Sequence, residues 1–145
     1  MAEQSNGLGG NQAIQPQLVL QKIYVKDVSF EVPNAPQIFQ ELGATEQQPQ
    51  VQLNLGHKAA ALGGDIYEVV LSLTLTCTLG ERTAYLAEVQ QAGIFGIAGF
   101  GTEEQNGIIG SYCPNLLFPY ARQVVSQMVL EGGFPPFLLQ PINFD

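Results

Sequence analysis

Residues 66–79 read IYEVVLSLTLTCTL, an alternation of apolar and polar side chains that fits an extended strand with one buried face. Gly80-Glu81 follows directly, and residues 83–91, TAYLAEVQQ, continue the strand-like pattern. A glycine-containing turn between two such runs predicts an antiparallel hairpin with one face toward solvent. The apolar face of the first strand carries Tyr67, Val69, Leu71, Leu73, Leu75, Cys77 and Leu79, and the polar face carries Glu68, Ser72, Thr74, Thr76 and Thr78.

Two further strands are predicted before this hairpin. Residues 18–32, LVLQKIYVKDVSFEV, are rich in β-branched and aromatic residues. Residues 33–43, PNAPQIFQELG, form a crossover connection with room for a short helical turn, because prolines are excluded from a central strand. Residues 51–55 alternate like a strand, and a turn follows at Gly63-Gly64, so that His57 is assigned to a loop.

The periodicity changes after Gly101, where a helix is predicted to begin. Thr102 and Gln105 have the spacing of a capping box, and two glutamates between them lie at the positive end of the helix dipole. The helix continues past Pro114 and Pro119 until Gly132-Gly133 ends it. Its apolar stripe needs a sheet to cover, which predicts an α+β domain with the helix on one face of the sheet. The stripe consists of Leu117, Ala121, Val124 and Met128.

The length of 145 residues fits one folded domain. Residues 1–16 are rich in Gln, Asn, Gly and Ser and predict a disordered tail, which leaves 17–145 as the domain. The tail lacks the basic and apolar regions of a secretory signal, and no run is long enough to cross a membrane. We therefore expect a cytoplasmic protein without membrane insertion.

The formal charge of −8 comes from 13 acidic residues against 5 Lys and Arg. Such a surface repels phosphate backbones and anionic lipids, which argues against nucleic acid as a partner. The acidity fits a basic protein partner and equally fits a general need for solubility.

The residues that could carry chemistry do not form a catalytic or metal-binding set. His57 has no nucleophile near it in the sequence, and Cys77 and Cys113 lack the spacing of zinc ligands. The glycines 99 and 101 precede a helix, but Glu104 occupies the place of the third glycine of a dinucleotide-binding turn, and its carboxylate repels a pyrophosphate. We expect neither an enzyme nor a cofactor or metal site.

Residues 93–101, GIFGIAGFG, favour a binding function instead. Four glycines separate apolar residues that cannot all face one core in a regular element, so some are expected to line a surface or partner contact.

The order of the blocks KIYVKDVSFEVPNAP, DIYEVVLSLT, TAYLAEVQQAGIFGIAG, YCPNLLFPYAR and PINFD resembles the SecB family of bacterial protein-export chaperones, nearly from Gln21 to Asp145. This resemblance implies a four-stranded antiparallel sheet with a crossover connection and a helix on one face, assembled as a dimer of dimers. It also implies an ATP-independent holdase that keeps unfolded precursor polypeptides translocation-competent and delivers them to the SecA motor.

The resemblance extends to individual residues. The motor-binding positions of the family match Asp27, Glu31, Leu86 and Glu88. Positions associated with packing and tetramer assembly match Tyr85, Ala87, Val89 and Gln91, for which a core role is also compatible. For the client groove we select Ile38, Phe39, Phe95, Phe100, Phe134 and Phe137, each of which equally fits a core position.

Two other functions are also compatible with the sequence. The same sheet and helix could close over a pocket, as in a small apolar-ligand carrier, and an enzyme could assemble its site from distant residues. One departure from the family also matters. Its members usually continue beyond NFD into a further helix and an acidic tail, which are absent after Asp145.

Overall fold

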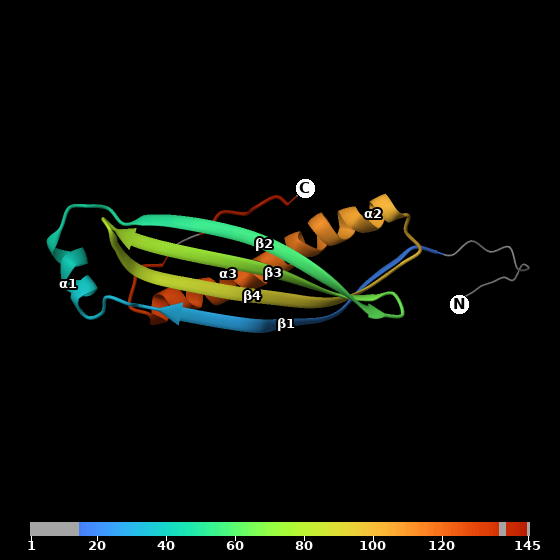
Figure 1. The fold of residues 1–145 in the computed structure, drawn as a ribbon, viewed down its shortest axis with the longest axis horizontal. Helices are drawn as coiled ribbons and strands as arrows, with labels where there is room; N and C mark the ends of the chain where they lie inside the picture. Colours follow the sequence, from blue (N-terminus) through green and yellow to red (C-terminus); the bar gives the residue numbers. More distant parts are fainter. Residues whose placement is uncertain (1–14, 137–138, 145) are drawn as a thin grey trace, which may run out of the picture.

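The computed structural model describes residues 15–136 and 139–144, which form one sheet covered on one face by a helical layer (Figure 1). The sheet is antiparallel, with the strand order β1-β4-β3-β2, as the resemblance implies. The elements in chain order are β1 (Gln17–Glu31), α1 (Gln37–Ala44), β2 (Gln50–Gly63), β3 (Ile66–Leu79), β4 (Arg82–Ala98), α2 (Thr102–Gly107), the π-helical turn η2 (Ile108–Tyr112) and α3 (Cys113–Glu131).

The predicted hairpin is confirmed as β3 and β4, which pair from Leu79 opposite Arg82 to Ile66 opposite Gly96. Gly80 makes the tight turn with a φ of 63°, a conformation that glycine adopts without strain. β4 is longer than predicted, because the glycine-rich residues up to Ala98 remain in the ladder. A Cβ at Gly93 would lie 2.7 Å from the Phe95 ring, so the glycine makes room for this ring within the strand.

β2 also runs further than its side-chain pattern indicates. Its ladder with β3 continues through Ala61, which pairs with Tyr67, and so His57 lies on a strand opposite Leu71 rather than in a loop. The extension is stabilised by backbone hydrogen bonds, which do not depend on apolar alternation, and the side chains of this part are exposed.

The crossover connection is confirmed, because β1 and β2 lie at opposite edges of the sheet. It contains α1, a helix of 8 residues beside one end of the sheet (Figure 1). Ile38 is the buried residue of α1.

The helical layer begins one residue earlier than the predicted capping box. Gly101 is the N-cap, and its N–H donates to Glu104 Oε1 at 3.2 Å, whereas Gln105 donates to the Tyr67 hydroxyl at 2.9 Å. Within α3 the predicted stripe packs on the core: Leu117 and Ala121 are buried, and Val124 and Met128 are partly buried against it. Val125 and Val129, which were not predicted, are more fully buried. The buried Leu117, Ala121, Val125 and Val129 recur at every fourth residue, so they form one line of contacts along the sheet.

The face of the sheet that α3 covers, the inner face, forms the core. α3 packs mainly on β4 and β3 and touches β1 at few points. Among the described residues, no helix covers the opposite, outer face. The buried side chains shared by the sheet and the helix include Leu71, Leu73, Leu75, Ala87, Val89, Phe95, Leu117, Ala121 and Val125.

β1 reaches this core through two irregularities. Its ladder with β4 shifts register between Leu20 and Lys22, and again between Val25 and Asp27. Each shift is a β-bulge that adds one residue and so exchanges the two faces of the strand. After the second bulge, Phe30 points to the inner face and stacks on Tyr85 at a centroid distance of 5.7 Å.

We predict that Gly132→Ala destabilises the protein. A Cβ at Gly132 would lie 2.2 Å from Phe30 Cε2, and the stacked ring has little freedom to move. The expected loss in the free energy of unfolding is about 1–3 kcal/mol, typical of overpacking, measured by urea denaturation at fixed protein concentration. Gly43→Ala is the control, because nothing lies within 4 Å of the added Cβ there. Equal stability of the two variants would contradict the close contact.

Candidate binding surfaces

The four residues matched to motor binding lie together on the outer face of β1 and β4. Glu31 pairs with Leu86 in the ladder, and Asp27 lies four residue pairs further along, opposite Gln90. Between them Ser29 lies opposite Glu88, and its Oγ donates to Glu88 Oε1 at 3.4 Å. We call Asp27, Glu31, Leu86 and Glu88 the acidic surface.

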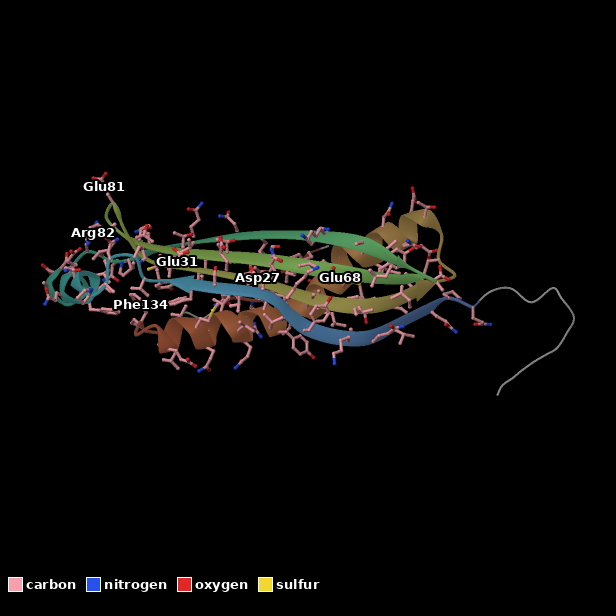
Figure 2. All side chains as sticks on the ribbon, turned by 60° about the horizontal axis from the view of Figure 1, so that its bottom comes forward. Asp27, Glu31, Glu68, Glu81, Arg82 and Phe134 are labelled. Carbon is pink, nitrogen blue, oxygen red and sulfur yellow. The ribbon has the colours of Figure 1, made fainter. Side chains whose placement is uncertain are left out.

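The outer face has a different character further along the strands. Figure 2 shows Glu31, Asp27 and Glu68 in succession along the sheet, away from α1. Glu68 on β3 accepts hydrogen bonds from the Tyr24 hydroxyl and from Lys26 Nζ, the latter at 2.8 Å. This network joins β1 to β3 across β4, in a sheet where β1 has only β4 as a hydrogen-bonded neighbour.

The network shifts the ionisation of its members. The Lys26 ammonium, followed by the Tyr24 hydroxyl, lowers the pKa of Glu68. The hydrogen bond to the Glu68 carboxylate, reinforced by burial and by its charge, raises the pKa of Tyr24 to about 12. The pair is therefore held as a charged carboxylate and a neutral phenol at neutral pH.

An apolar recess opens where the crossover connection, the start of β2 and the residues after α3 meet. This crossover recess has a volume of about 430 Å³. Phe134 packs against Tyr85 with a centroid distance of 4.7 Å and against Phe39 at 5.1 Å. Burial raises the pKa of the Cys77 thiol in the lining, so this cysteine is an inert wall residue. Its lining is mainly apolar, with Leu42, Pro49, Val51, Cys77, Tyr85, Phe134, Pro135 and Pro136 beside the polar Thr45, Gln47 and Gln48.

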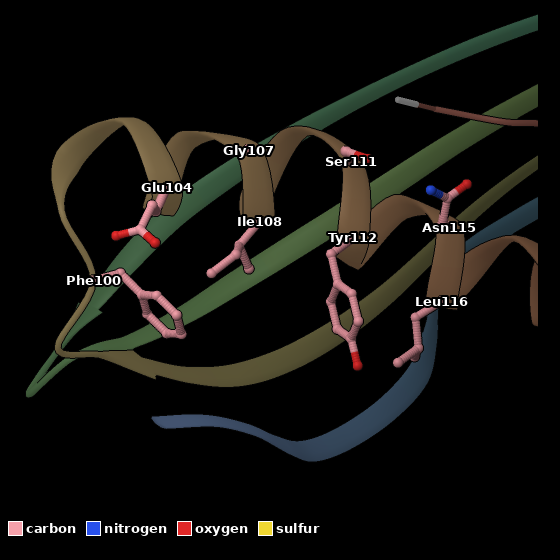
Figure 3. Close-up of a pocket in the computed structure, with 8 residues that line it drawn as sticks. All are labelled: Phe100, Glu104, Gly107, Ile108, Ser111, Tyr112, Asn115 and Leu116. Carbon is pink, nitrogen blue, oxygen red and sulfur yellow. The ribbon is translucent and has the colours of Figure 1, made fainter. Parts of the chain in front are cut away.

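A second recess lies at the other end of the helical layer. This helix recess has a volume of about 720 Å³ and is lined by Phe100, α2, η2 and the start of α3. Figure 3 shows the side chains of Phe100, Ile108, Tyr112 and Leu116 on one side of the helix. η2 lies directly before Pro114, which has no N–H to donate to the preceding turn and so disturbs the regular α-helical ladder.

The residues predicted for one client groove are divided between these places. Phe134 lines the crossover recess and Phe39 packs against it, whereas Phe100 lines the helix recess. Ile38 and Phe95 are fully buried in the core, so neither side chain is open to a client in this conformation. Phe137 lies outside the described residues.

The residues matched to assembly, Tyr85, Ala87, Val89 and Gln91, are buried on the inner face of β4. Their core role is therefore established in the subunit. The sequence reasoning missed an exposed apolar strip beside them on β1. Leu20, Val25 and Val28 face the same way with exposed fractions of 41%, 43% and 45%. The apolar composition of residues 18–32 was the available signal, but the bulges conceal which side chains share a face.

The recesses and surfaces contain no evident catalytic machinery within the described residues. No group of three or more His, Cys, Asp or Glu is arranged to hold a metal ion in this part of the chain. Across residues 15–136 and 139–144, no helix is long and apolar enough to cross a membrane.

Comparison with known proteins agrees with the geometry. Residues 11–145 match the family model described as preprotein translocase subunit SecB. The protein-export protein SecB of Stenotrophomonas maltophilia is 54% identical over 133 residues, which are 92% of this chain and 75% of the relative. That of Nitrosococcus oceani is 52% identical over 146 residues, covering 100% of this chain and 88% of the relative.

A solved structure has the same fold. The SecB-like chaperone Rv1957 of Mycobacterium tuberculosis, in complex with a ChAD peptide from the HigA1 antitoxin, matches with a TM-score of 0.71 and 17% identity. The match covers 87% of this chain and 91% of that one. The fold and the relatives together define a chaperone of protein export. The chain belongs to the SecB family.

We predict that Glu68→Gln lowers the pKa of Tyr24 from about 12 toward the ordinary value of 10.0, because a neutral amide removes the charged acceptor. Phenolate absorbance during an alkaline titration measures this change. Tyr85, whose pKa burial raises to about 12, is the internal control. The raised pKa means that the stabilisation by Tyr24 is present below pH 10.0 and is lost as the pH rises toward 12. An unchanged titration would refute the hydrogen bond.

Proposed function

We propose that the protein is an ATP-independent holdase that binds unfolded precursor polypeptides, keeps them translocation-competent and passes them to the SecA motor. The observation that carries this proposal is the pair of apolar recesses at the two ends of the helical layer. The layer from Thr102 to Glu131 is 30 residues long, or roughly 45 Å. An extended polypeptide of roughly 13 residues spans that distance.

Two separate open recesses suit an unfolded chain better than a compact ligand. An unfolded client loses conformational entropy when it is ordered, so many weak contacts along its length serve it better than one deep site. Both linings contain aromatic and aliphatic side chains beside polar ones, and among the described residues Glu104 is their one charged member, so apolar contacts can form without selecting one sequence. Each recess is also of a size for a small apolar molecule, and a carrier of such ligands is the alternative.

The proposed assembly is a homotetramer formed as a dimer of dimers. β1 is an edge strand, and one side of its ladder is open to pairing with another chain. The exposed strip of Leu20, Val25 and Val28 continues the core along that edge. Tyr85, Ala87, Val89 and Gln91 are then proposed to act in assembly indirectly, through the packing of β4 under α3.

The motor is proposed to bind the acidic surface through its basic, zinc-bearing tail. The acidic surface lies on the outer face and shares no residue with the lining of either recess, so client and motor can bind simultaneously. The net charge of −8 supports association with a basic partner. The proposed setting is the cytoplasm, without cofactor, catalysis, nucleic acid or membrane insertion.

Client binding is tested by Phe39→Ser in α1, where the ring is 40% exposed and packs against Phe134. We expect the Kd for an unfolded precursor segment to rise roughly threefold to tenfold, the cost of losing most of one aromatic contact. Light scattering coupled to size exclusion gives the mass of the assembly and its uptake of the segment. Leu62→Ser is the matched control, because Leu62 is 55% exposed and lies outside both recesses.

Two results would reject the holdase proposal. One is equal binding of the folded and unfolded forms of the precursor, and the other is no uptake of the unfolded segment by the assembled protein. A one-to-one complex with a lipid, together with no effect on precursor aggregation, would establish the carrier instead.

Motor binding is tested by the double variant Asp27→Lys with Glu88→Lys. Reversing two charges on one face removes electrostatic complementarity, so we expect motor affinity at low salt to fall by roughly tenfold or more and client affinity to be unchanged. The control, Glu81→Lys with Glu103→Lys, makes the same change of charge at exposed positions outside the acidic surface. Calorimetry with the motor's tail peptide measures the first affinity. Equal weakening by both double variants would show a general charge effect instead of a docking surface.

A further inference from the structure

Gln91 is a polar side chain in a place where an apolar one would be expected. It is 2% exposed on the inner face of β4, between Leu71 on β3 and Val25 on β1. A leucine of similar size would fill the position without burying an amide. Polar groups kept in such places generally serve a structural or functional purpose that packing does not explain.

The contacts of Gln91 identify this purpose. Its Nε2 donates to the backbone carbonyl oxygen of Tyr24 at 3.1 Å. Its Oε1 is buried and has no hydrogen-bond partner among the described residues. The Gln91 amide therefore makes one hydrogen bond, to β1, while no donor in the described part of the chain reaches its oxygen.

Tyr24 directly precedes the second bulge of β1. Val25 lies opposite Gln91 and Asp27 lies opposite Gln90, so Lys26 is the additional residue. The Gln91 amide reaches across from β4 and holds the backbone of β1 at the start of this bulge.

The position of the bulge decides which side chains of β1 reach the outer face. Before it, Tyr24 is on the outer face, where its hydroxyl donates to Glu68. After it, Phe30 is on the inner face against Tyr85. Without the additional residue, strict alternation from Tyr24 would place Asp27 and Glu31 on the inner face and Phe30 outside.

We propose that Gln91 is a positioning residue that fixes the bulge at Lys26 and thereby holds Asp27 and Glu31 on the acidic surface. This inference deepens the proposed function, because the acidic surface is the proposed motor site. It assigns to Gln91 an action on β1 within one subunit, separate from any contact between subunits. β1 is an edge strand that α3 contacts at few points, so its register depends on its ladder with β4 and on side-chain contacts such as those of Gln91 and Glu68.

The test measures the register of β1 directly with a disulfide. In the variant Ser29→Cys with Glu88→Cys, the two thiols lie directly opposite on the outer face and can be oxidised to a disulfide. In the variant Val28→Cys with Glu88→Cys, the thiols point to opposite faces and bridge only after a slip of one residue. The natural Cys77 and Cys113 are buried and remain in place.

Each pair is combined with Gln91→Leu, which keeps the size of the side chain and removes the donor. With Gln91 present, we expect the bridge at 29 and 88 to dominate. With Gln91→Leu, the ratio of the 29–88 to the 28–88 bridge is expected to fall by roughly fivefold, the effect of losing about one net hydrogen bond. Gln90→Leu, on the outer face of the same strand, is the matched control with an unchanged ratio.

Circular dichroism and the thermal unfolding midpoint of Gln91→Leu show whether the variant is folded. They therefore distinguish a general loss of structure from a change in the register of β1. Gln91→Leu removes the unpartnered Oε1 together with the donor, so the fold is expected to be retained while the register loosens. If Gln91→Leu does not fold, Gln91→Met, which also lacks an N–H donor, takes its place. A folded variant with the original bridge ratio would overturn the proposal.

The binding of the motor's tail peptide is then measured for Gln91→Leu and for the unmodified protein. A changed bridge ratio with weakened peptide binding is the expected result. Failure of the unmodified protein to bind the peptide would reject the proposed motor site and leave the disulfide result on the register intact. The two conclusions are therefore tested independently.

Discussion

The burial of the inner face of β3 and β4 under α3 is the constraint on which the rest of the structure depends. Both strands present a row of small and medium apolar side chains there, and α3 answers with buried residues at every fourth position from Leu117 to Val129. Packing at this density fixes the position of the helix on the sheet. The ends of the helical layer follow from that position, and with them the places where the two recesses open.

The same constraint accounts for what the sequence could and could not predict about the fold. Apolar and polar residues alternate along β3 except at Val70, so both the length and the faces of this strand were predictable. The end of β4 was not, because Gly93 and Gly96 look like breaks in a sequence, whereas Gly93 makes room for the Phe95 ring within the strand. The end of β2 was not predictable either, because its exposed last residues lack apolar alternation. The helix stripe includes the predicted Val124 and Met128 as partly buried residues, but its most buried line runs through Val125 and Val129. The crossing of helix and sheet, which the sequence does not show, decides which residues lie deepest.

The four residues matched to the motor site by resemblance lie on one face of the sheet, and their role stays a prediction. Asp27 and Glu31 share a face because no bulge lies between them, and the ladder brings Leu86 and Glu88 beside them. The crossover recess could not be predicted from the sequence. Its lining residues Leu42, Tyr85 and Phe134 meet only after the crossover connection and the end of α3 fold against β4. For the same reason Ile38 and Phe95, apolar residues in glycine- or proline-rich surroundings, were assigned to a groove although the core contains them.

Each strand of this sheet contributes side chains to both faces. A shift of one strand can therefore affect the core and the outer surface together. In β4 the inner residues Ala87 and Val89 alternate with the outer Leu86 and Glu88, so a shift of β4 would disturb core and surface together. Hydrogen-bonded neighbours on both sides hold β4 against such a shift. β1 has one neighbour, two bulges and a largely exposed inner face, so a change in its register alters the outer face at little cost to the core. β1 thus carries half of the acidic surface while it makes few contacts with α3, and polar contacts from Gln91 and Glu68 restrain it in addition to its ladder with β4.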